Sequence, residues 1–315
     1  MAAPLDVKIG RWALVVRTLK ETYADNCLGL AAQLAYYFFL SVFPALLVLV
    51  ALTSFFPHHL LDHMLTWFSV LTPPDVLQIV RAQIELITRS GHTPLLTFGA
   101  LGALWSSSAA MTAIIDTLNR AYGVTEARSW WRVQVLAIVL TIIMSVFVLV
   151  AFTLVVAGPE IAEAIAARLG LGPVFAWAWK ILQWPVVFLL ISVGFGCVYY
   201  LAPDAEQRWP WILPGANLAT ALWLLISLGF RFYVVNFGQF NKMYGTIGGV
   251  IVMLLWFYLS GLVLLVGAEF NSEVEHASPY GKAEGEKVPG EHRGWLFRWR
   301  RHTGLGETPE SPGIR

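Results

Sequence analysis

Charged and amide side chains stand near the ends of the long apolar segments of this chain. In chain order they are Asp116, Asn119, Arg120, Asn217, Glu269 and Asn271. If the apolar segments cross a membrane in alternating directions, these six groups lie near one depth. Ionisable groups at membrane depth usually pair or face a polar pathway, so the set predicts a polar site or gate at that level. Anchoring of helix ends in the lipid headgroups would explain the same residues without a site.

A second candidate for binding is Arg231, with Asn241 and Tyr244 a few residues further on. Arg231 follows Trp211 by 20 residues, which is about 30 Å along a helix, so it belongs to the opposite membrane surface. A guanidinium recognises anionic groups well, and the expected ligand is an amphipathic anionic molecule. Snorkelling of the long arginine side chain towards the headgroups is the alternative explanation.

Metal and nucleophile chemistry finds little support in the sequence. His58, His59 and His63 stand together, and the last two are four residues apart. No further ligand cluster accompanies them, so we expect no metal and no cofactor. The serines at 106–108 lack the sequence context of a catalytic nucleophile. We therefore do not expect an enzyme.

The elements that must position these residues are six stretches without Asp, Glu, Lys or Arg. The shortest has 22 residues, and only 13% of the chain is charged, which is about half the usual share in soluble proteins. About 20 apolar residues suffice for a helix to cross a bilayer. We predict an all-α polytopic membrane protein whose transmembrane domain covers 26–270. Its six helices are expected at about 28–56, 95–115, 133–157, 181–202, 211–235 and 246–269.

The distribution of lysine and arginine predicts the orientation. With the N-terminus inside, the inner segments hold 15 of the 21 basic residues, the outer segments hold five, and Arg231 lies within a span. Basic residues are enriched in cytoplasmic segments. Both termini are therefore predicted to be cytoplasmic.

The segments outside the spans have their own patterns. Residues 1–25 contain an amphipathic helix, over about 5–21, expected to lie on the inner membrane face. A second amphipathic helix is predicted over 75–89, on the outer side. The tail, 271–315, has seven acidic and seven basic residues with many Gly and Pro, which predicts a disordered cytoplasmic segment. A net charge of +1 gives no reason to expect nucleic acid as a partner.

The segment 95–115 is rich in small residues at four-residue spacing, including Gly102 and Ser106. Such ladders allow close helix approach, so this segment is predicted to be a central helix. We further expect Arg120, at its inner end, to pair with Glu269 as well as with Asp116.

Several sequence blocks resemble the YihY/BrkB family. They are Ala31 to Pro44, Leu104 to Ser108 followed by Ile115 to Tyr122, Asn241 to Gly249, Leu255 to Tyr258, and Gly267 to Asn271. The resemblance covers about 10–275 and implies a bacterial inner-membrane protein with six spans. Members were once labelled ribonuclease BN, and the sequence offers no metal-binding His and Asp cluster for such an activity. Association of other members with envelope phenotypes implies a role with envelope lipids.

Two functions follow as hypotheses. In the first, the protein moves or flips an amphipathic anionic envelope molecule, such as a lipid, along a pathway formed by segments 95–115, 211–235 and 246–269. In the second, it is a non-transporting structural or scaffold protein of the envelope. A transporter needs polar groups that face a continuous cavity, whereas a scaffold can bury them in pairs. Membrane lipids are expected partners in both cases, and the oligomeric state is left open.

Overall fold

A computed structural model describes residues 10–53, 93–156, 158–169, 172–237, 246–278, 281–282 and 286–288. All regular structure in these ranges is α-helical, which confirms the predicted class. The helices are α1 (Arg11–Ala24), α2 (Cys27–Thr53), α5 (Thr93–Ala121), α6 (Trp130–Val156), α7 (Gly158–Leu169), α8 (Gly172–Leu201), α9 (Trp209–Phe237) and α11 (Thr246–His276). The predicted helix over 75–89, and the candidates Asn241 and Tyr244, lie outside the described residues.

Among the described residues, four helices are long and apolar enough to cross a membrane. Their spanning portions are Trp130–Ala151, Trp177–Leu201, Trp209–Val234 and Gly248–His276, and Cys27–Val42 is a shorter apolar stretch. The extent of α11 corrects a predicted boundary. We expected disorder from residue 271, but α11 continues to His276, and residues just beyond it are packed against the bundle.

The long helices contact one another in chain order. α2 packs on α5, α5 on α6, α6 on α8, α8 on α9, α9 on α11, and α11 returns to α2. α5 also touches α11, while α7 folds back on α8. The helix with the most neighbours is α11, which packs on α1, α2, α5 and α9, so α11 takes the central place that was predicted for α5. Gly102 of α5 borders open space, so this member of the small-residue ladder mediates no close approach.

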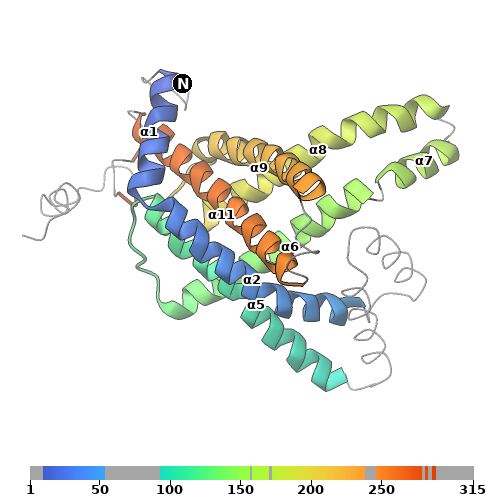
Figure 1. The fold of residues 1–315 in the computed structure, drawn as a ribbon, viewed down its shortest axis with the longest axis horizontal. Coiled ribbons are helices and arrows are strands. Elements are labelled where there is room, and N and C mark those ends of the chain that lie inside the picture. The colour runs from blue at the N-terminus through green and yellow to red at the C-terminus, as the bar shows by residue number, and fades with distance from the viewer. Residues whose placement is uncertain are drawn as a thin grey trace, which may run out of the picture.

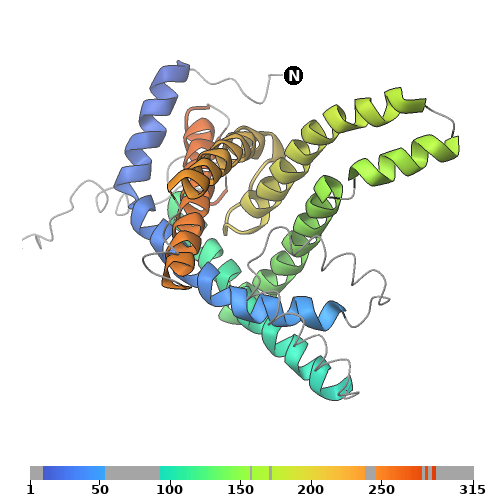
Figure 2. The same cartoon turned by 45° about the vertical axis from the view of Figure 1, so that its right-hand side comes forward.

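The helices meet at one end and diverge at the other (Figures 1 and 2). The buried core draws on one end of each helix, including Leu34 of α2, Leu118 of α5, Leu140 of α6, Tyr199 of α8 and Leu265 of α11. The opposite ends expose large apolar side chains, among them Val148, Leu189, Leu225 and Ile251. We call the packed end, which contains Cys27, Ala121, Leu201 and Trp209, the closed end.

The tightest crossing in the described bundle joins α9 and α11 at the closed end. A Cβ atom on Gly215 would overlap the carbonyl oxygen of Gly267, and one on Gly267 would overlap the hydroxyl of Tyr199. Small residues permit such backbone contact between helices in membranes. The backbone N–H of Gly215 also donates to Asn271 Oδ1 at 2.7 Å, so the crossing is fixed by a hydrogen bond as well as by shape.

Replacing either glycine at this crossing by alanine should destabilise the bundle. Because the new methyl group meets backbone or a buried hydroxyl, the expected loss is about 1–3 kcal/mol of unfolding free energy. Gly229→Ala, whose Cβ would enter open space, is the matched control and should be neutral or stabilising by up to about 1 kcal/mol. Denaturant unfolding in detergent measures all three. Equal stability of the three variants would contradict the crossing.

Candidate functional site

Glu269 lies at the closed end, buried to 2% exposure. Its carboxylate Oε1 accepts a hydrogen bond from the thiol of Cys27 on α2, with Sγ and Oε1 3.4 Å apart. A thiol is a weak donor. The contact therefore joins α11 to α2, but it stabilises the carboxylate less than a cation would.

Asn271 is equally buried and joins α11 to α9 through the Gly215 bond described above. Its Nδ2 atom and the hydroxyl of Tyr122 are both buried without a completed hydrogen bond, although the two groups face each other. Two turns further in, the Tyr199 hydroxyl donates to the carbonyl oxygen of Leu264 at 2.8 Å. α8, α9 and α11 are thus connected by polar contacts on both sides of the glycine crossing.

A network that we call the loop clamp ties the α5–α6 loop to the α8–α9 loop. Its members are Asn119, Glu126, Arg128, Asp204 and Lys287. Asn119 Nδ2 donates to Glu126 Oε2 at 2.9 Å, and the backbone N–H of Asp204 donates to Asn119 Oδ1 at 2.8 Å. Arg128 holds Glu126 with two nitrogens, at 2.8 and 2.6 Å, and donates to the carbonyl oxygen of Ala202 at 2.8 Å.

The tail supplies the last partners of these loops. Lys287 forms an ion pair with Asp204, and its carbonyl oxygen accepts from the N–H of Glu206 at 2.8 Å. Lys282 Nζ lies 3.4 Å from Glu275 Oε2, with both side chains nearly fully buried, and donates to the carbonyl oxygen of Glu206 at 2.7 Å. This part of the tail is therefore an integral part of the closed end.

The predicted pairing of Arg120 with Glu269 is wrong. Arg120 pairs with Asp116 at 3.0 Å, and both side chains are about half exposed. They sit on the outward side of α5, whereas Glu269 faces Cys27. Two residues at the same depth in a membrane can therefore project from sides of their helices that do not face each other.

Asn217 lies two turns into α9 and accepts a hydrogen bond from Ser192 of α8, with 2.7 Å between the oxygens. Arg231 is exposed further along the same helix. At 100° per residue, the two side chains project from α9 within about 40° of each other, on the side of α8. The predicted set of polar residues therefore divides into separate contacts.

A small cavity of about 40 Å³ opens at the closed end between α1, α5 and α11. Its lining comprises Glu21, Asp25, Ala121, Tyr122, Gly123, Glu269, Ser272, Glu273 and His276. In the part of the chain that the structure describes, no three His, Cys, Asp or Glu side chains are arranged to hold a metal ion. The cavity is large enough for ordered water.

A larger, apolar groove lies between α9 and α11, on the diverging side of their crossing. Its volume is about 470 Å³, and it is lined by Leu225, Ile226, Gly229, Phe230, Tyr233, Leu255 and Leu259. Trp256 lies beside it in tilted ring contacts, with its ring centroid 5.1 Å from that of Phe230 and 5.7 Å from that of Trp223. Arg231 leaves α9 from the side opposite the groove lining, by the same 100° rule.

Sequence reasoning missed the loop clamp and the Cys27 contact. The available signal was the charged Glu126-Ala127-Arg128 in a short loop, and Asp204 directly after an apolar segment. Opposite charges in two short loops at one membrane surface favour pairing, but nothing in the sequence shows that the two loops are adjacent.

Comparison with known proteins gives one family. A family model described as virulence factor BrkB matches residues 18–291. The ribonuclease-like protein YfkH of Bacillus subtilis is 37% identical over 258 residues, which are 81% of this chain and 94% of that protein. A UPF0761 membrane protein of Tolumonas auensis is 26% identical over 263 residues, 80% of this chain and 82% of that protein. No solved structure matches.

The loop clamp should weaken in acid. Partial burial raises the pKa values of Asp204 and Glu126, but bonds from Lys287 to Asp204 and from Arg128 to Glu126 outweigh it and hold both below their ordinary values. Carboxyls with a depressed folded pKa add stability above the ordinary pKa of about 4, and that stability is lost as the pH falls through the folded value.

Asp204→Asn should therefore cost about 1 kcal/mol at pH 7, and the difference from the parent protein should shrink at pH 3. Asp116→Asn, in the exposed pair with Arg120, is the control and should cost less than about 0.5 kcal/mol. Thermal unfolding in detergent at both pH values gives the comparison. A penalty for Asp204→Asn that is unchanged at pH 3 would contradict the clamp.

Proposed function

This chain belongs to the BrkB virulence-factor family of integral membrane proteins, and we propose that it binds and moves an amphipathic, anionic envelope molecule such as a lipid. The observation that carries the proposal is the asymmetry of α9 and α11. They are sealed at the closed end by the Gly215–Gly267 crossing, and beyond it they separate to form an apolar groove of about 470 Å³.

The proposed topology has six spans in the bacterial inner membrane, with the closed end in the cytoplasm. α2 and α5 have 27 and 29 residues, lengths that suffice to span about 30 Å of hydrocarbon. Basic residues gather at the closed end, namely Arg17, Lys20, Arg120, Arg128, Arg132, Arg208, Lys282 and Lys287, whereas Arg168 and Lys180 lie at the other. This distribution favours a cytoplasmic closed end.

The groove is suited to an acyl chain. All seven lining residues are apolar, glycine or tyrosine, and Gly229 leaves open space in its wall. Leu225, on the rim, is 65% exposed and would face lipid directly. A chain could therefore enter sideways from the bilayer without passing the closed end. Arg231 follows Phe230 but projects from the α8 side of α9, away from the groove, so an anionic headgroup would have to reach around α9 to meet its guanidinium.

The pathway that the sequence suggested is modified in this proposal. α5 was expected to line it together with α9 and α11, but the principal neighbours of α9 are α8 and α11. We therefore place the apolar part of the ligand between α9 and α11. The polar groups of α9, Asn217 and Arg231, would act on the opposite side of that helix, towards α8.

A scaffold role is the second candidate, and the closed end favours it. Cys27 with Glu269, Gly215 with Asn271, and Lys282 with the carbonyl oxygen of Glu206 are contacts that connect different parts of the chain. A scaffold can bury its polar groups in such pairs. Under this hypothesis the groove would hold lipid permanently and would not release it.

The topology predicts which side of the membrane each end of the bundle faces. A cysteine replacing Ile165 of α7, an exposed residue at the diverging end, should react with an impermeant maleimide in intact cells. One replacing Val288, exposed at the closed end, should react only after permeabilisation. The parent protein, which retains Cys27 and Cys197, gives the background. Reaction of position 288 in intact cells would refute the orientation.

Filling the groove should reduce lipid binding. Gly229→Leu would place a side chain in the groove, and Gly102→Leu, also in open space but on α5, is the matched control. The readout is covalent capture of a phosphatidylglycerol probe with a photoreactive acyl chain by the purified protein. We expect capture to fall about fivefold for Gly229→Leu, equivalent to about 1 kcal/mol, and to be unchanged in the control.

Arg231→Gln tests the anionic part of the proposal. It should leave capture of a phosphatidylcholine probe unchanged and lower capture of the phosphatidylglycerol probe by about fivefold, as expected for one charge. Equal capture by the parent and Gly229→Leu would reject the groove. A competition experiment distinguishes permanent lipid occupancy from transport. If an excess of free lipid does not displace the bound probe, the result supports the scaffold hypothesis.

A further inference from the structure

The N-terminal helix α1 packs with a largely polar stripe inward and an apolar stripe outward. Leu14, Thr18 and Thr22 are buried and fall on one arc of about 80° around the helix axis. Thr18 and Thr22 donate to the carbonyl oxygens of Leu14 and Thr18, at 3.0 and 2.7 Å. Their hydroxyls therefore need no partner on α11, which allows a partly polar stripe to be the packed one.

The buried stripe fixes α1 to the closed end of the bundle. Leu14 forms a separate apolar cluster with Trp211 of α9 and Val274 of α11, and Phe270 packs against it. α1 also runs beside the end of α11 in both cartoon views (Figures 1 and 2). The helix is thus held where α9 begins and α11 ends.

The outward stripe consists of large apolar side chains. Trp12, Val15, Val16, Leu19 and Tyr23 are exposed, with Trp12 and Tyr23 at 79% and 81%. At 100° per residue they share one arc of about 100°. In water, such a surface would be costly, and exposed apolar patches of this kind mark a lipid or protein contact.

The charges on α1 are sorted around the same axis. Lys20 and Arg17 are exposed and follow the apolar arc on one side, at about 80° and 140° from Trp12. The acidic Glu21 and Asp25 instead line the small cavity on the bundle side. The apolar face is therefore bordered by cations, while the carboxylates are directed away from it.

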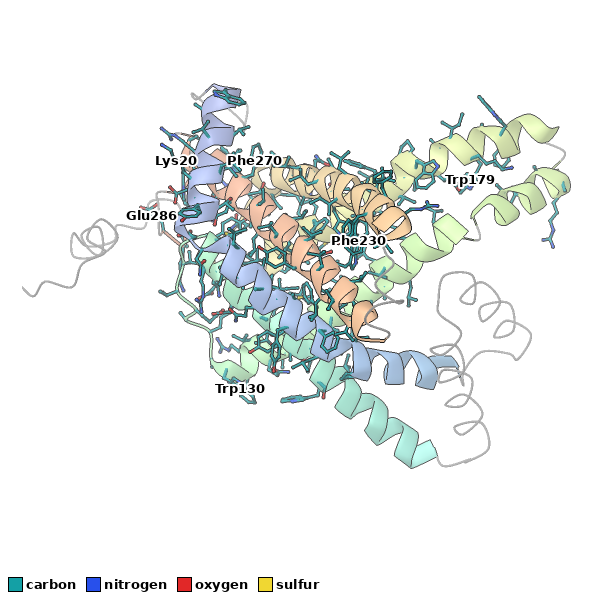
Figure 3. The ribbon with its side chains drawn as sticks, in the orientation of Figure 1. Lys20, Trp130, Trp179, Phe230, Phe270 and Glu286 are labelled. Atoms are coloured by element: carbon teal, nitrogen blue, oxygen red, sulfur yellow. The ribbon has the colours of Figure 1, made fainter. Side chains whose placement is uncertain are left out.

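The level of α1 corresponds to a membrane interface. Trp130 and Trp131 begin α6 at the closed end and are exposed, and the Arg132 guanidinium lies 5.2 Å from the Trp131 ring. Exposed tryptophans mark the headgroup level in membrane proteins. Figure 3 shows Lys20 and Phe270 at the upper left and Trp130 at the lower left, whereas Trp179 lies on the right-hand side.

We propose that α1 lies in the headgroup layer on the closed side of the bilayer and binds anionic phospholipid through Lys20 and Arg17, with its apolar arc inserted below them. A helix with basic residues beside an apolar face binds anionic membrane surfaces through apolar burial and electrostatic attraction together. Because Leu14 packs against Trp211 and Val274, binding of α1 to the anionic leaflet would also restrain the adjoining ends of α9 and α11. The inference does not depend on the groove.

The test uses the full-length protein in nanodiscs of phosphatidylcholine, with or without phosphatidylglycerol. A cysteine at position 19, on the apolar arc, carries an environment-sensitive fluorophore. Positions 13 and 24 are exposed alanines off that arc and serve as matched controls. We expect brominated lipid to quench the probe at 19, and aqueous iodide to quench it at 13 and 24. Quenching at 19 by brominated lipid should increase with phosphatidylglycerol.

Charge removal completes the experiment. Lys20→Gln and Arg17→Gln should each lower the bilayer-inserted fraction of α1 about fivefold in anionic discs, with no effect in phosphatidylcholine. Arg168→Gln, on α7 at the other end of the bundle, should change nothing. Iodide quenching at 19 equal to that at 13, insertion independent of phosphatidylglycerol, or 19-to-19 cross-linking between two copies would each overturn the proposal.

Discussion

The backbone contact between α9 and α11 at Gly215 and Gly267 is the constraint on which the rest of the closed end depends. Only glycine allows the two helices to approach until a carbonyl oxygen fills the space of a side chain. The same approach brings the Asn271 amide within 2.7 Å of the Gly215 nitrogen. Since two helices that cross at one point separate beyond it, the crossing also creates the groove lined by Phe230 and Leu259.

Polar contacts consolidate the closed end because a membrane offers them few alternatives. Charges at an exposed helix end need no partner from another helix, because they can meet water or headgroups, and the half-exposed Arg120 and Asp116 pair only with each other. A charge enclosed by other helices cannot, and must find a partner in the protein. Lys282 and Glu275 pair at 3.4 Å with almost no exposed surface. Breaking such a pair from one side leaves a buried charge, which typically costs about 3–5 kcal/mol.

The sequence predicted the helices well and their neighbours poorly. Long apolar runs determine where helices form, because only helices satisfy the backbone within a bilayer. Which helices touch depends on local shape, and the membrane depth inferred from sequence position does not identify the neighbouring helices. Gly102 lies in a regular ladder of small residues yet borders open space, whereas Gly215 and Gly267 stand outside any ladder that we recognised. The predicted pairing of Glu269 with Arg120 was wrong for the same reason. The sequence indicated the membrane depth of both residues but not the side of the helix from which each one projects. The tail was misjudged because composition alone gives no sign that Lys287 pairs with Asp204, or that Lys282 donates to the carbonyl oxygen of Glu206, both far away along the chain.

The two ends of the bundle differ in what a motion would cost. Separating α9 from α11 at the closed end would break the Asn271 bond, pull Leu14 and Val274 from Trp211, and strain the tail contacts at Glu206. Separating them at the groove would part apolar side chains such as Tyr233 and Leu255. Lipid tails can replace those contacts at little cost, since they are as apolar as the side chains. Movement is therefore cheapest where the groove already lies, with the glycine crossing as its pivot. A ligand that widens the groove would have to overcome packing alone, while the hydrogen bonds and ion pairs of the closed end stay intact.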